Sequence, residues 1–227
     1  MQDPLTAEAA ANGYDSGGVD QADRADQADR TDRVVRPRGW AKAVTDVLSP
    51  AHFVIALPPV IGWHATYPAT GGLVWGLFCS ALAGGVPYGF VLWGVRRRRF
   101  SDIHIKARRE RYVPILVALA AMGLCVAVLV LGGAPRALAA LLAALLSAIA
   151  VGGVITTRWK ISGHASAASG AVGICAVCFG PWVLAFSPLA LVIAAARLRL
   201  RDHTAAQLAA GIALGAIVPP AVMYTLM

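Results

Sequence analysis

Long apolar runs follow one another along most of the chain, each bounded by polar, glycine or proline residues. They cover about residues 51–67, 71–95, 112–132, 136–157, two stretches within 165–200, and 204–227. Most of these runs have close to the length of about 20 residues that a helix needs to cross the hydrocarbon core of a bilayer. Backbone groups in lipid must be satisfied within their own segment, so each run should be a helix. The pattern predicts an all-α fold, a polytopic integral membrane helical bundle with about 6–7 transmembrane helices.

Two places in this pattern are ambiguous. The first run is short and is interrupted by Pro58–Pro59. The fifth and sixth runs are divided either at Gly180–Pro181 or at Ser187–Pro188, and both divisions remain open. The division matters because it decides which residues begin the sixth span.

Residues 1–46 have a different character from the rest. The segment 21–33 repeats Ala, Asp and Arg or Gln, and such a composition buries too little apolar surface to offset the entropy of ordering. No basic start followed by an apolar core is present, so the segment is not a signal peptide. We therefore expect a disordered polar tail over 1–46 and a transmembrane domain over 47–227.

The composition supports a membrane protein. The chain is 58% hydrophobic and 14% charged, whereas soluble domains carry about 25% charged residues. Nine of the twelve acidic residues precede residue 47. The four cysteines all lie in apolar runs and are interpreted as small buried hydrophobes, with no metal site expected.

Basic residues are concentrated in alternate connections between the runs. Thirteen of the fourteen Lys and Arg residues after position 47 lie in 96–111, 156–164 and 197–203. The positive-inside rule places these connections and the N-terminus in the cytoplasm. The charges mark the ends of apolar runs rather than a stripe on a polar domain, so membrane lipids and not nucleic acid are the expected partners. High Ala and Gly content, with Arg far above Lys, favours a GC-rich bacterial genome and hence a multi-pass protein of the bacterial plasma membrane.

The same connections carry candidate chemistry. Ser162-Gly163-His164 opens a helix rich in small residues, and a helix N-terminus offers free N–H groups and positive dipole charge to an anion. Two histidines, His164 and His203, suit a nucleophile and an acid. Basic side chains complete a phosphate pocket: Lys106, Arg108, Arg109, Arg111 and Arg197.

With these residues in place, the chain resembles the type 2 phosphatidic acid phosphatase superfamily over about residues 50–227. That family has three motifs, KxxxxxxRP, PSGH and SRxxxxxHxxxD. Here the first reads KARRERYVP over 106–114, the second ISGH over 161–164 and the third ARLRLRDHTAAQ over 196–207. The separations between the motifs leave room for two helices between each pair of connections.

The resemblance implies roles for these residues. His203 would be the nucleophile that forms a phosphohistidine, and His164 the general acid for the leaving alkoxide. The phosphate oxygens would be held by Lys106, Ser162, Gly163 and Arg197. No metal or cofactor is implied. The implied substrates are lipid phosphate monoesters and polyprenyl phosphates or diphosphates.

Two departures from the family pattern bear on activity. Gln207 stands where the family has the Asp that orients the nucleophile, and it retains a hydrogen bond but no charge. Val113 replaces a phosphate-binding Arg, for which Arg109 or Arg111 are candidate substitutes. The alternative is therefore a catalytically inactive member that binds anionic lipid headgroups or a membrane partner. If the enzyme is active, a cytoplasmic site favours a lipid phosphate made at the inner leaflet, such as a polyprenyl-linked sugar phosphate or phosphatidylglycerophosphate.

Overall fold

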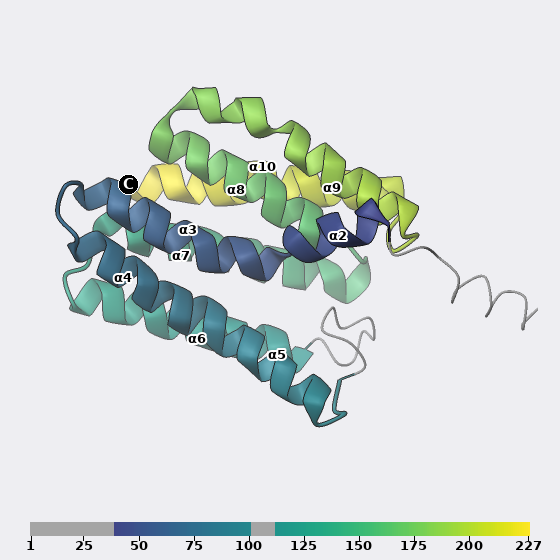
Figure 1. The fold of residues 1–227 in the computed structure, drawn as a ribbon, viewed down its shortest axis with the longest axis horizontal. Coiled ribbons are helices and arrows are strands. Elements are labelled where there is room, and N and C mark those ends of the chain that lie inside the picture. The colour runs from purple at the N-terminus through teal and green to yellow at the C-terminus, as the bar shows by residue number, and fades with distance from the viewer. Residues whose placement is uncertain (1–38, 101–111) are drawn as a thin grey trace, which may run out of the picture. The chain divides into compact units, whose positions relative to one another are not determined.

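The computed structural model describes residues 39–100 and 112–227, and every regular element in these ranges is helical. The helices form a bundle in which neighbouring segments run along one another (Figure 1). In chain order the elements are α2 (Trp40–Val47), α3 (Pro50–Thr66), α4 (Gly71–Cys79), the π-helix η2 (Ser80–Gly85), α5 (Val86–Arg96), α6 (Tyr112–Leu131), α7 (Arg136–Arg158), α8 (Gly163–Phe179), the 3₁₀-helix η4 (Pro181–Phe186), α9 (Pro188–Arg199) and α10 (Ala205–Leu226).

The described residues contain five helical segments long and apolar enough to cross a membrane. The pair α2 and α3, bent by 44° at the break between them, is a sixth if counted as one span. Helix α8 is apolar but has only 17 residues. The fold is thus the all-α polytopic membrane bundle that the apolar runs predict.

The division of the fifth and sixth runs falls at Gly180. Helix α8 ends at Phe179, and Gly180 has φ +104°, a backbone conformation that residues with a Cβ rarely adopt. The Ser187–Pro188 position is instead the junction where the 3₁₀-helix η4 passes into α9. The chain therefore turns back at glycine and begins its next span at Pro181.

The prolines inside α3 do not end that helix, which continues to Thr66. Pro59 lacks the N–H that would bond the carbonyl of Ile55, and an unsatisfied carbonyl in lipid is costly. Ser80 Oγ, at the start of η2, donates a hydrogen bond of 2.6 Å to that carbonyl. A serine of the neighbouring span thereby replaces the bond that proline removes.

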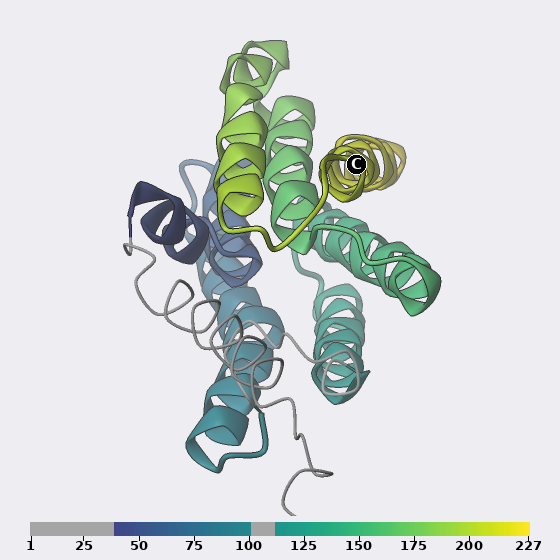
Figure 2. The ribbon, with the colours of Figure 1, turned by 90° about the vertical axis from the view of Figure 1, so that its right-hand side faces the viewer.

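Helices α8 and α10 make the most extensive helix pair, and α8 lies between α9 and α10 (Figure 2). A Cβ added to Gly215 would collide with the Ser166 carbonyl and the Ser169 hydroxyl, and one added to Gly173 would collide with Pro220. Small residues of both α8 and α10 thus allow the two helices to approach closely, as is common between membrane helices.

Candidate phosphate site at one end of the bundle

Helices α7 and α9 end, and α8 and α10 begin, at the same end of the bundle (Figure 1). The opposite end is marked by a hydrogen bond of 2.7 Å from Arg136 Nε to the Leu226 carbonyl, and by a ring contact between His64 and Phe179. The described parts of the basic connections therefore gather at one end. They bring the second and third sequence motifs to neighbouring positions.

The second motif forms the N-terminus of α8. Ser162 is the N-cap residue, with extended backbone, and its buried Oγ accepts a hydrogen bond of 3.4 Å from the Ala165 N–H. His164 follows on the first turn with a buried side chain. Gly163 is exposed, and no atom lies within 4 Å of where its Cβ would be. The backbone at Gly163 is thus accessible to an approaching anion.

The third motif leads into the N-terminus of α10, where Thr204 and Gln207 form a capping box. Gln207 Oε1 accepts a hydrogen bond of 3.2 Å from the Thr204 N–H, and it lies 3.3 Å from His203 Nδ1. An atom that accepts from a backbone N–H is the amide oxygen, so the Nδ1 that faces it must be the donor. The neutral imidazole then carries its proton on Nδ1 and has its lone pair on Nε2, the nitrogen that is free to act as a nucleophile.

A backbone hydrogen bond joins the two helix N-termini. The Ser162 N–H donates to the Gln207 carbonyl over 3.2 Å. Gly211, one turn further along α10, is required there because a Cβ would meet the Ser162 carbonyl. His164 lies two residues from one end of this hydrogen bond, and His203 lies four residues from the other.

Charged groups surround the turn between α9 and α10. Arg197, buried near the end of α9, pairs with Asp202 at 3.1 Å between Nη1 and Oδ2. Lys160 Nζ donates to the Asp202 carbonyl over 2.8 Å. Arg201 has φ +53°, and this left-handed residue turns the chain back so that the Asp202 N–H reaches the Arg197 carbonyl. Through the Lys160–Asp202 hydrogen bond, the turn between α9 and α10 contacts the connection that precedes the second motif.

These surroundings lower the pKa of His203 to about 4. Burial is the largest cause because it disfavours the charged imidazolium, and the positive charges of Lys160 and Arg197 act in the same direction. The hydrogen bond to Gln207 and the charge of Asp202 oppose the shift. His203 is therefore neutral at physiological pH, which is the protonation state that a nucleophile needs.

The structure brings together five of the predicted site residues. Gln207 contacts His203, and the charge of Arg197 acts on the same imidazole. The hydrogen bond from the Ser162 N–H to the Gln207 carbonyl joins this turn to Ser162 and its neighbour Gly163. Lys106, Arg109 and Arg111 lie outside the described residues, and Val113 is exposed at the start of α6.

Three residues that contact the candidate site were not predicted from the sequence: Lys160, Asp202 and Thr204. The T-x-x-Q spacing of a capping box was a signal for Thr204. No sequence pattern indicates the Asp202–Arg197 pair, because it depends on the left-handed turn at Arg201.

Comparisons with protein-family models, curated proteins and solved structures find no match to this chain.

Proposed function

We propose that this protein is a membrane phosphatase of the type 2 phosphatidic acid phosphatase kind, which hydrolyses a lipid phosphate through a phosphohistidine intermediate. The observation that carries the proposal is His203: its imidazole is neutral, and Gln207 fixes the tautomer with the lone pair on Nε2. A histidine so arranged is prepared to attack phosphorus. The resemblance of the three motifs to the family supports the same role.

In the proposed reaction, Nε2 of His203 attacks phosphorus as the bond to the lipid oxygen breaks. His164 gives its proton to the leaving alkoxide, so the products of this step are a lipid alcohol and a phosphohistidine. A water molecule then attacks the phosphohistidine and gives a proton to His164. The step releases inorganic phosphate and returns both histidines to their starting states.

The phosphate oxygens would be bound by the Gly163 N–H, the Ser162 N-cap and the basic groups near them. Arg197 is held in place by Asp202, whose carboxylate orients the guanidinium. From the sequence, Lys106, Arg109 and Arg111 are the further proposed ligands. We also propose that the site faces the cytoplasm of a bacterial plasma membrane, with the N-terminus on that side, because the basic connections lie at this end.

Phosphate release from a panel of lipid phosphates by purified protein in detergent tests the proposal. His203→Ala should abolish turnover, and His164→Ala should lower it about 100-fold or more, as expected when a general acid is lost. The matched control is His64→Ala, at the opposite end of the bundle, which should keep activity.

Release that persists in His203→Ala would show that another group is the nucleophile. Absence of release from every lipid phosphate would favour the non-catalytic alternative, in which the same basic end binds anionic headgroups.

A further inference from the structure

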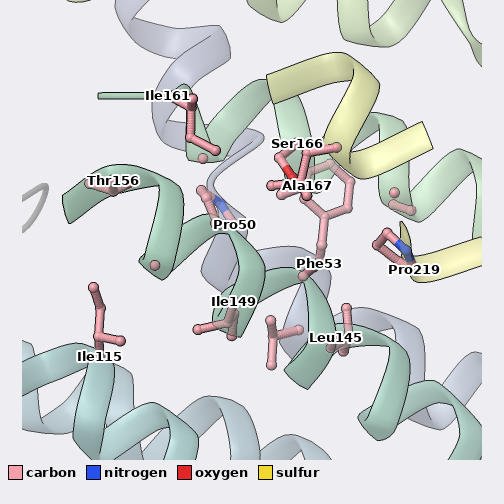
Figure 3. A pocket seen from close by; sticks show the side chains of 18 of the residues that line it. Pro50, Phe53, Ile115, Leu145, Ile149, Thr156, Ile161, Ser166, Ala167 and Pro219 are labelled. Carbon is pink, nitrogen blue, oxygen red and sulfur yellow. The ribbon is translucent and has the colours of Figure 1, made fainter. Parts of the chain in front are cut away.

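An apolar cavity of about 290 Å³ lies between α3, α7, α8 and α10 and extends to the start of α6. Figure 3 shows Phe53, Leu145 and Ile149 within its walls, and Ser166 and Ala167 on the side of α8. Of the described residues that line it, only Thr156 and Ser166 have polar side chains. The cavity therefore suits hydrocarbon rather than a polar ligand.

One end of this cavity reaches the candidate phosphate site, because Gly163 is among its lining residues. Gly163 is the first residue of α8 and precedes His164. A phosphate at this helix N-terminus would have its ester oxygen next to an apolar space. An alkyl chain attached to that oxygen could extend directly into the cavity.

The other side of the cavity adjoins a second apolar cavity, of about 350 Å³, between α6 and α7. Four residues line both: Ile115, Ile149, Gly153 and Thr156. The second cavity opens on the outer surface of the bundle, where Leu116 and Val154 are 63% and 71% exposed. In a membrane this surface faces lipid, so the two neighbouring cavities lie between the bilayer and Gly163.

The volume of the inner cavity limits what it holds. At about 30 Å³ for each water-sized unit, 290 Å³ corresponds to roughly ten such units. This is room for a stretch of hydrocarbon chain.

We propose that this cavity binds a hydrocarbon chain of the lipid phosphate, which enters between α6 and α7 and presents its phosphate at Gly163. The proposal rests on the function proposed above and assigns the site that binds the substrate's chain. The discriminating element is Gly153, which lies where the two cavities meet and has no atom within 4 Å of its Cβ position. A leucine there has space to be accommodated, and it fills the place where the two cavities meet.

The test uses dodecyl phosphate with a photoreactive diazirine in mid-chain, bound to the full-length His203→Ala protein so that no turnover occurs. We expect labelling of α3, α7 or α8 at the cavity, and about tenfold weaker labelling when Gly153→Leu is added, because the leucine side chain occupies space that the hydrocarbon chain would fill. Gly123→Leu is the matched control: Gly123 is also a half-buried helical glycine with open space at its Cβ, but it lies on α6 outside both cavities. Labelling of the Gly123→Leu protein should stay within about twofold of that of the His203→Ala protein.

Ala167→Leu fills the cavity from α8 and serves as a second variant if Gly153→Leu does not fold.

Unlabelled competitors test whether the hydrocarbon chain contributes to binding. Dodecyl phosphate should compete at least about tenfold better than butyl phosphate, because its longer chain buries more apolar surface in the cavity. Labelling outside the cavity, labelling unchanged by both filling variants, or equal competition by the two phosphates would overturn the inference. Phosphate release by the unmodified protein is measured separately. Labelling at the cavity without release would remove the phosphatase proposal and keep the chain-binding site.

Discussion

At the scale of single residues, Gln207 performs two tasks with one oxygen. Oε1 caps the N-terminus of α10 through the Thr204 N–H and orients His203 through Nδ1. A neutral amide does both without charge, so it fixes the tautomer but gives little support to a positive imidazole. The lowered pKa of His203 follows from burial and neighbouring cations, which no carboxylate at position 207 offsets.

Replacing Gln207 with glutamate adds that carboxylate with the side-chain length kept. We expect Gln207→Glu to raise the pKa of His203 above about 4, because a negative charge favours the imidazolium. His203 attacks only when neutral, so the acid limb of the kcat/KM profile should lie near pH 4 in the native protein and at higher pH in the variant. On the plateau, turnover should rise about tenfold, because the carboxylate stabilises the positive charge that develops on the ring.

The length-matched control is Gln207→Met, which removes the acceptor. It should lower turnover, since Nδ1 loses its partner and Nε2 is no longer fixed as the lone-pair nitrogen. Thermal unfolding should be little changed in Gln207→Glu, because glutamate also completes a capping box. An acid limb that stays in place in Gln207→Glu would show that position 207 does not act on His203.

At the scale of elements, uniform apolar runs with clear ends were predictable from sequence. The expected spans 112–132 and 136–157 match α6 and α7 closely, because glycine and proline residues mark the turn between them. The bend between α2 and α3 and the π-helix η2 were not predictable, since both depend on neighbouring helices. Ser80, for example, satisfies a carbonyl 25 residues away. In the same way, the motif histidines were identifiable from spacing, whereas the Asp202–Arg197 pair required the turn geometry.

Close approach of α8 and α10 positions both motifs, so a methyl group between these helices should be disruptive. Gly215→Ala would place a Cβ against the Ser166 carbonyl, and the helices would have to move apart. We expect a loss of about 1–3 kcal/mol in stability, seen as a lower Tm in detergent. Gly123→Ala, which meets open space on α6, should be neutral or stabilising by up to about 1 kcal/mol because alanine favours helix. Equal Tm values for the two variants would contradict this account of the α8–α10 contact.

At the scale of the whole bundle, charge is distributed unequally between its two ends. The end with the candidate site carries Lys160, Arg197, Arg199 and Arg201, whereas the turns 67–71, 132–136 and 180–187 at the opposite end contain one basic residue, Arg136. From this asymmetry the positive-inside rule predicts that the end with the candidate site faces the cytoplasm. If the proposed function is correct, the substrate would then come from the inner leaflet.

Single cysteines test this orientation in intact cells. In a background without the four native cysteines, we expect Ala69→Cys, in the turn between α3 and α4, to react with a membrane-impermeant maleimide. Ala205→Cys, at the start of α10, should react only after the cells are permeabilised. Both alanines are exposed, so the comparison is between two matched positions at opposite ends of the bundle. The expectation follows from the excess of Lys and Arg at the α10 start, because basic loops are retained in the cytoplasm. Labelling of Ala205→Cys from outside, with Ala69→Cys protected, would place the candidate site outside the cell and assign its substrate to the outer leaflet.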